Sequence, residues 1–297
     1  MQKPSTIAVI GVGKMGGGVA RNLAARPEYR VRVFDLSDAA MQRCDEAGAT
    51  AHATASETAE GADLVITSLP LPAHVLQTWA DLAPALPPGT LCMDVSTIDP
   101  TTAAQLERDL GARGLPFVAC LLGKGPAQAE SGDVPLFVGG PDEALDALGD
   151  VFGVIGAGVH RMGGVEAAAA FKLVSNLIGM TNLAVLAEGY LLCRRAGVDD
   201  ATFTAALADT GGWSYQADLR LPWMMAGDFA SRFPMELGLK DVRLAVDMAG
   251  QWAVPAPVGA ATMTQLAAAV AQGYGGEDVD AVVKVVDPRG TIRGAGA

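Results

Sequence analysis

The sequence predicts an α/β protein in which a doubly wound, mostly parallel sheet with its helices is followed by an all-α domain, the two joined by a long helix. Three observations carry this prediction. A short β-branched run near the start of the chain enters a glycine-rich turn and a helix, and further strand patterns follow up to about residue 138. A long apolar segment follows, and beyond it only helical patterns occur. A chain of 297 residues is long enough for two domains.

The apolar segment at residues 165–196 is expected to form one continuous helix. From residue 167 to residue 187 it carries a single charge, Lys172, and no proline. At 1.5 Å per residue the helix would be about 45 Å long, and an all-round apolar helix must be covered on nearly all sides. A membrane span is the alternative, which polar residues such as Ser175 and Asn176 disfavour. We therefore expect a buried interdomain helix, covered in part by a second subunit of a homodimer or homotetramer.

Lys172 is the first candidate for chemistry. It lies four residues before Asn176, so the two side chains share one face of the helix. A lysine among apolar neighbours loses hydration, its pKa tends to fall, and it then exchanges protons near neutral pH. The alternative is a lysine whose stem packs on the helix while its ammonium group reaches solvent.

Composition narrows the class of partner. The net charge of −12 disfavours nucleic acid and anionic membrane surfaces. Four cysteines without a C-x-x-C pair indicate reduced thiols, and three histidines at no metal-ligand spacing indicate no metal site. No leader pattern precedes the first predicted strand, so we expect a cytoplasmic protein.

The glycine-rich turn has the full context of a dinucleotide-binding fingerprint. The strand at residues 6–10 enters G-x-G-x-x-G, a helix is expected at 15–25 and a second strand at 31–34. The turn consists of Gly11, Val12, Gly13, Lys14, Met15 and Gly16. Its glycines let the backbone approach a pyrophosphate, whose charge the helix amino terminus favours. The alternative is a turn that only packs the helix on the strand, but the pattern predicts a Rossmann-type NAD-binding domain at 1–164 and a helical domain at 165–297.

Asp35 indicates which dinucleotide is used. It ends the second strand, 19 residues after Gly16, where its carboxylate can accept hydrogen bonds from both ribose hydroxyls. Leu36, Ser37 and Asp38 follow, without a lysine or arginine. A 2′-phosphate would meet carboxylates there, so NAD is favoured over NADP.

The ends of the later strands supply further candidates. Strands are expected at 62–68, 90–94, 116–121 and 134–138. Leu69 and Pro70 follow the first of these, and Ser96 and Thr97 follow the second, so both pairs should lie at the carboxyl edge of the sheet, where ligands bind. The alternatives are a plain turn and a helix cap. A loop at 123–126 sets a lysine among glycines, which allows close approach to a ligand or marks a solvated turn.

The motifs GVGKMG, LP, DVSTIDP, VGG, KLVSN and LKDVRLA occur in this order. In this arrangement, from Ile7 to Val285, the chain resembles the β-hydroxyacid dehydrogenase family, whose members include 3-hydroxyisobutyrate dehydrogenase and tartronate semialdehyde reductase. The resemblance implies an NAD-dependent oxidoreductase that interconverts a small β-hydroxy acid, or a related anionic alcohol, and its aldehyde or ketone by hydride transfer.

The resemblance also implies roles for single residues. Lys172 matches the catalytic lysine, the general acid/base; Asn176 matches the asparagine one turn on; and Ser96 matches a substrate-side serine. On the cofactor side it places Gly11, Gly13, Met15, Gly16, Leu69, Pro70 and Thr97, with His74 where relatives often carry asparagine and Lys240 near both cofactor and active site.

Three departures from the family pattern concern the substrate. Gly123, Lys124 and Gly125 replace the usual SGG substrate loop, so a carboxylate-binding serine becomes glycine. The usual GxGxxxK before the catalytic lysine loses both glycines, and the NN pair after it becomes Ser175 and Asn176. Relatives that reduce a sulfonated aldehyde also carry a basic residue in this loop. Lys124 is therefore expected to pair with a carboxylate, phosphonate or sulfonate, or else to face solvent or the cofactor phosphates.

Two other functions fit the same pattern less well. An imine reductase resembles this fold but usually lacks the lysine, and a non-catalytic NAD-binding scaffold would need neither Lys172 nor Ser96. Downstream helices are expected at 202–207, 235–249, 258–271 and 278–285, with a mobile tail at 287–297. The substrate is expected between the two domains, with Trp213 and Phe233 as candidate lining residues.

Overall fold

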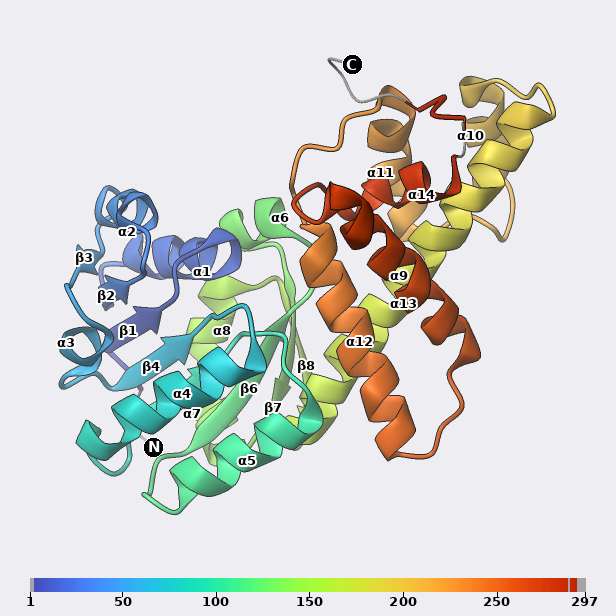
Figure 1. Ribbon diagram of the computed structural model, residues 1–297. Helices are drawn as coiled ribbons and strands as arrows, with labels where there is room; N and C mark the ends of the chain where they lie inside the picture. The colour runs from blue at the N-terminus through green and yellow to red at the C-terminus, as the bar shows by residue number, and fades with distance from the viewer. Residues whose placement is uncertain (1–2, 288, 293–297) are drawn as a thin grey trace. The chain divides into compact units, whose positions relative to one another are not determined.

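The computed structural model describes residues 3–287 and 289–292, and the remainder of the predicted tail lies outside the described residues. The chain divides into two compact units, Met1–Lys172 and Leu173–Ala297. The first unit holds the sheet and its helices, and the second is helical (Figure 1). The predicted fold class is confirmed.

The first unit is built on an eight-stranded sheet whose order is β3-β2-β1-β4-β5-β6-β7-β8. The strands are β1 Thr6–Ile10, β2 Arg30–Phe34, β3 Thr50–Ala51, β4 Leu64–Thr67, β5 Leu91–Asp94, β6 Phe117–Leu122, β7 Pro135–Gly139 and β8 Gly158–Gly163. All neighbouring pairs are parallel except β6 with β7. Strand order reverses between β1 and β4, so the carboxyl ends of β1, β2 and β4 flank the point at which open α/β sheets bind ligands.

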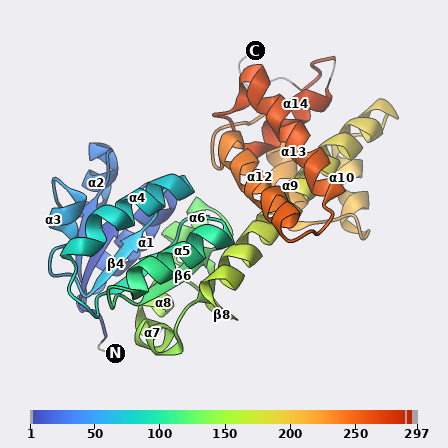
Figure 2. The same cartoon turned by 60° about the horizontal axis from the view of Figure 1, so that its bottom comes forward.

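Helices cover both faces of the sheet, which is why its central strands are buried along their whole length and mostly apolar. One face packs against α1 Lys14–Ala24, α2 Asp38–Asp45, α6 Pro126–Glu130, α7 Asp142–Ala147 and α8 Gly149–Ile155. The other packs against α3 Ala55–Ala59, α4 Pro72–Leu82, α5 Pro100–Gly111 and the first turns of α9 Val165–Arg195. Figures 1 and 2 show α4 and α5 side by side.

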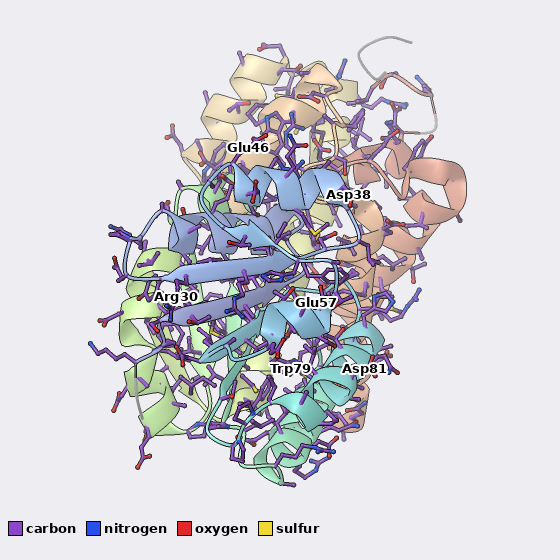
Figure 3. The ribbon with its side chains drawn as sticks, turned by 90° about the vertical axis from the view of Figure 1, so that its left-hand side faces the viewer. Arg30, Asp38, Glu46, Glu57, Trp79 and Asp81 are labelled. Carbon is purple, nitrogen blue, oxygen red and sulfur yellow. The ribbon has the colours of Figure 1, made fainter. Side chains whose placement is uncertain are left out.

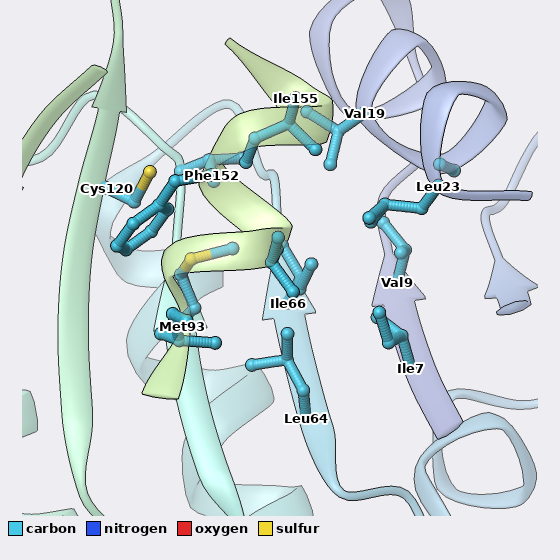
Figure 4. Packing of buried hydrophobic residues seen from close by; sticks show 14 of the residues in the cluster. Ile7, Val9, Val19, Leu23, Leu64, Ile66, Met93, Cys120, Phe152 and Ile155 are labelled. Carbon is cyan, nitrogen blue, oxygen red and sulfur yellow. The ribbon is translucent and has the colours of Figure 1, made fainter. Parts of the chain in front are cut away.

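The first of these faces shows why β1 and β4 alternate side chains between two cores. Ile7 and Val9 point to the same side as Leu64 and Ile66, and they meet Leu23 and its neighbours on α1 (Figure 4). The residues between them in sequence belong to the opposite core. Asp38, Glu57 and Asp81, which are labelled in Figure 3, are exposed on the helices α2, α3 and α4.

The helix α9 spans 31 residues, Val165 to Arg195, as predicted. By length and composition alone it could cross a membrane, and 39% of its most apolar window is buried within the chain. Its large apolar side chains are not covered on all sides. Five of them, 40% to 71% exposed, recur three, four or seven residues apart along the helix: Phe171, Val174, Ile178, Val185 and Leu192. The chain itself therefore covers one side of α9, and a stripe along the helix stays exposed.

The second unit consists of the rest of α9 with α10 Asp200–Ala208, α11 Tyr215–Ala226, α12 Met235–Gln251, α13 Pro257–Ala269 and α14 Val283–Val286. Short turns, η2 Val270–Tyr274 and η3 Val279–Val282, connect the last helices. Their core is lined by residues such as Leu183, Tyr190, Leu221 and Val242. The predicted helices agree within about two residues, but α11 was not expected, because Pro222 lies inside it.

Candidate functional site

The glycine turn between β1 and α1 packs so tightly that two of its positions have no room for a side chain. Gly11 has φ +88°, and its N–H donates to the Phe34 carbonyl at 2.8 Å. A Cβ on Gly11 would lie 2.3 Å from the Ser68 carbonyl oxygen, and one on Gly16 would lie 2.1 Å from the Gly11 carbonyl oxygen. The ends of β1, β2 and β4 thus meet backbone to backbone.

Gly13, unlike Gly11 and Gly16, faces open space. A Cβ there would meet no described atom within 4 Å. Gly13 precedes α1, whose first turn has no acidic residue and no side-chain cap. The N–H groups and dipole at this helix end therefore favour a bound anion. The turn fits the pyrophosphate of a dinucleotide, with Val12 and Met15 beside the two glycines.

Asp35 holds the turn from the end of β2. Its Oδ2 accepts from the Val12 N–H at 2.7 Å, and its Oδ1 accepts from the Ser37 N–H at 2.9 Å. Two oxygens offer about four lone-pair positions, so acceptor capacity remains for ribose hydroxyls. Leu36 is 95% exposed, and Asp38 opens α2 nearby (Figure 3).

The carboxyl ends of β4 and β5 come together as the sequence predicts. The Leu69 N–H donates to Ser96 Oγ at 2.8 Å, and Ser96 is buried. Thr97, the next residue, is half-buried, while Pro70 is exposed. His74 is exposed in the first turn of α4, directly after this segment. Asp94, which sequence reasoning took only as the end of a strand, accepts from the Ser96 hydroxyl at 2.7 Å.

The Gly123–Gly125 loop explains the missing serine. A Cβ on Gly123 would lie 2.5 Å from Cγ of Pro135, the first residue of β7. Lys124 adopts φ +57°, a left-handed conformation, and its Nζ lies 2.7 Å from Asp133 Oδ2. Asp133 was not a predicted site residue. The lysine charge is therefore offset by a carboxylate within the same loop.

Lys172 is 8% exposed, which is unusual for a lysine. Ala168 and Ala169, four and three residues before it, are fully buried in the core against the sheet. Gly139, at the end of β7, approaches Ala168, and Phe171 contacts the Phe137 ring at 4.6 Å between centroids.

The helix α9 therefore runs from the end of β7 toward its start. The start of β7 meets the carboxyl end of β6, since the Gly123 N–H donates to the Pro135 carbonyl. Lys172 lies one turn of the helix after Ala168, on the same side of α9, and therefore farther toward the start of β7. Gly139 also explains one departure from the family's GxGxxxK pattern. Because Gly139 has no side chain, Ala168 fits where the pattern has its second glycine.

The second unit positions the remaining candidates through Asp241. Asn176 Nδ2 donates to Asp241 Oδ2 at 2.6 Å, and Lys240 Nζ lies 2.9 Å from Asp241 Oδ1. Asp241 is buried, and Lys240 is mostly buried. Asp241 was not a predicted site residue. Its position next to Lys240 in the LKD motif was the feature of the sequence that could have indicated it.

The chain is similar to known proteins over nearly its whole length. Residues 6–164 match the family model described as the NAD binding domain of 6-phosphogluconate dehydrogenase, and residues 167–286 match the model described as NAD-binding of NADP-dependent 3-hydroxyisobutyrate dehydrogenase. L-threonate dehydrogenase of Cupriavidus necator is 32% identical over 286 residues, which cover 94% of this chain and 95% of that protein.

Two solved structures are similar in fold. The structure of 3-hydroxyisobutyrate dehydrogenase from Salmonella typhimurium is 26% identical, with a TM-score of 0.87 over 95% of this chain and 99% of that one. A Streptomyces aurantiacus imine reductase is 19% identical, with a TM-score of 0.65 over 95% of this chain and 99% of that one. The latter likeness shows the fold alone.

Proposed function

The chain belongs to the β-hydroxyacid dehydrogenase family, and from that premise we propose how its own residues carry out the reaction. It is an oxidoreductase that uses a nicotinamide dinucleotide and acts on a small hydroxy acid. We propose Lys172 as the general acid/base. The burial of this lysine on the side of α9 that faces the sheet is the observation that carries the proposal.

The reaction needs one proton transfer at the substrate oxygen. When bound, the nicotinamide ring supplies the hydride acceptor in oxidation and the hydride donor in reduction. Lys172 takes the proton from the substrate hydroxyl in oxidation and returns it to the forming alkoxide in reduction. Asn176 orients the lysine or the substrate from the next turn of the helix, and its amide is itself oriented by Asp241.

We propose NAD as the preferred dinucleotide. Gly11, Val12, Gly13, Met15 and Gly16 would hold the pyrophosphate, and Asp35 the ribose. Leu69, Pro70, His74, Thr97 and Lys240 complete the cofactor side. Asp35 and Asp38 would repel a 2′-phosphate, so kcat/KM should be higher with NAD than with NADP.

The substrate proposed is a small β-hydroxy acid or a related anionic alcohol, held by Ser96, Asn176 and the Gly123–Gly125 loop. Lys124 lies in this loop, where a substrate anion would compete with Asp133 for its ammonium group. We place the NAD-binding domain at 1–164 and the substrate and oligomerisation domain at 165–297, in a cytoplasmic homodimer or homotetramer.

The proposal is tested by following NADH absorbance with a panel of 3-hydroxy acids that differ in their anionic group. Turnover of at least one member with NAD is the expected result. Tight NADH binding without turnover of any hydroxy acid would contradict the assigned reaction.

A further inference from the structure

A buried chain of hydrogen bonds joins the carboxyl ends of β4 and β5. Thr67 and Asp94 are the last residues of these strands, are paired in register, and are fully buried. Thr67 Oγ1 donates to Asp94 Oδ1 at 2.7 Å, and the Trp79 indole N–H donates to Thr67 Oγ1 at 3.0 Å. The chain thus begins on α4 and reaches a carboxylate at the edge of the sheet.

Asp94 continues the chain into the segment after β5. Its Oδ1 accepts from Ser96 Oγ at 2.7 Å, and its Oδ2 accepts from the Ser96 N–H at 3.0 Å. Ser96 Oγ in turn accepts from the Leu69 N–H at 2.8 Å. The segment after β4 is therefore tied to the segment after β5 through one hydroxyl group.

The direction of each proton in this chain is fixed. The indole N–H and the Leu69 N–H can only donate, so both hydroxyls accept from them. Each hydroxyl then has one proton to give, and both protons go to Asp94. Because the Ser96 proton is used in this way, Ser96 offers a ligand only the acceptor side of its oxygen.

We propose that Asp94 is a positioning residue, which acts through the Ser96 hydroxyl to hold the backbone at Leu69 and so couples the cofactor segment to the substrate-side turn. The assignment of these two segments rests on the proposed function. In this arrangement Ser96 meets the substrate as a hydrogen-bond acceptor, for the substrate's hydroxyl group, and the donors for the acid group come from elsewhere in the site. Leu69 and Ser96 behave as one unit whose geometry is set by a carboxylate that touches neither ligand.

The test compares Asp94→Asn, Ser96→Ala and the double variant by two measurements that need no turnover. Amide hydrogen exchange at Leu69 reports the bond itself in the protein without cofactor. Titration with NADH reports the cofactor segment. Each single variant should speed Leu69 exchange and weaken NADH binding by about tenfold, the effect of losing one hydrogen bond to or through a charged group. The double variant should be no weaker than the weaker single variant, because both changes break the same connection.

Asp63→Asn is the matched control. Asp63 Oδ2 also accepts two backbone N–H bonds and one hydroxyl bond, from Ser5 and Thr6, but it lies at the opposite edge of the sheet, at the start of β1. This variant should lower the melting temperature while leaving Leu69 exchange and NADH affinity unchanged. If Asp94→Asn is not recovered folded, Ser96→Ala, which removes a single oxygen, carries the same expectation.

Two results would overturn the proposal. One is a Ser96→Ala protein that keeps Leu69 protection and NADH affinity but loses affinity for the hydroxy acid, since Ser96 would then be a substrate donor. The other is an equal effect of the Asp94 and Asp63 variants on both measurements, which would make Asp94 merely structural. A protein that turns over no hydroxy acid would contradict the proposed function and still give a clear answer on Asp94.

Discussion

Lys172 is the residue on which the proposed chemistry depends. Lys172→Ala should lower kcat by about 10²–10⁴, the usual contribution of general acid–base catalysis. NADH affinity should stay within about twofold of wild type, because the lysine acts on the substrate oxygen. Steady-state kinetics and NADH titration measure the two effects.

Lys172→Arg is the matched variant for this prediction. Arginine keeps a positive charge of similar reach but does not give up its proton. It should be as inactive as the alanine variant if Lys172 exchanges protons. Recovery of wild-type kcat by arginine, or more than about a tenth of wild-type kcat in the alanine variant, would leave Lys172 without the acid/base role.

A second prediction asks whether Lys124 binds the substrate, since its ammonium group already forms an ion pair with Asp133. If its ammonium group binds a substrate anion, Lys124→Ala should lower kcat/KM by about tenfold, the low end for a hydrogen bond to a charged group at a position one-third exposed. Asp133→Asn should have the opposite effect, since it releases the lysine. A raised KM for NAD alone in Lys124→Ala would place the lysine on the cofactor side.

At the scale of the elements, the short turn η3 contains a buried carboxyl group, that of Asp280, whose titration changes the free energy of unfolding. Asp280 is fully buried, and neither carboxyl oxygen has a hydrogen-bond partner among the described residues. Burial and the nearby charge of Asp278 raise the pKa of Asp280 from 3.8 to about 8. The folded protein therefore keeps this proton between those values, while the unfolded chain releases it.

The contribution of this carboxyl group to stability is fully present below about pH 4 and is lost as the pH rises through about 8. Asp280→Asn should abolish this loss. The free energy of unfolding of the variant minus that of wild type should increase by about 1.4 kcal/mol per pH unit at most between these limits. Urea unfolding at several pH values measures it.

Asp278→Asn is the contrasting variant, because Asp278 accepts from Arg220 Nε and from the Phe233 N–H. It should destabilise the protein, because it weakens the contacts to Arg220 and to the Phe233 N–H. A difference between the Asp280→Asn protein and wild type that does not vary with pH would show that Asp280 does not titrate as inferred.

The elements also show what the sequence can predict. The strands buried on both faces, the helix after the glycine turn, α9 and the helices expected beyond it were located within about two residues, whereas α2 to α8 were not placed individually. The two-residue β3 and the edge strand β8 were missed, because a short strand has no period and an exposed edge strand has no continuous apolar run. Pro222 likewise hid α11.

The sequence could predict those site residues that directly follow a strand, because the end of the strand fixes their place at the edge of the sheet. Leu69 and Ser96 follow neighbouring strands, and the structure joins them by a hydrogen bond. The partners Asp94, Asp133 and Asp241 could not be assigned in this way, because their contacts depend on register and loop conformation rather than on spacing. The roles assigned to the site residues remain predictions.

At the scale of the whole molecule, the exposed stripe of α9 indicates self-association. Ile178, Val185 and Leu192 expose more than half of their side chains on one line of the helix. A second copy of the chain would remove this apolar surface from water. We expect a dimer or a higher even oligomer in sedimentation at micromolar concentration.

Ile178→Lys together with Val185→Lys should shift this equilibrium toward monomer, because two charges would be buried without partners. Leu36→Lys is the control, since Leu36 is exposed on the sheet unit and is not part of the stripe. A wild-type protein that sediments as a stable monomer would contradict the assembly.

The contact between Gly123 and Pro135 has a consequence for any redesign of this loop. A serine in place of Gly123 would need space that the proline ring occupies, and the proline begins the strand next to β6. A serine at residue 123 is blocked as long as the proline stays, whereas residue 135 can be changed first. Grafting a serine-bearing loop onto this protein would therefore have to begin at residue 135.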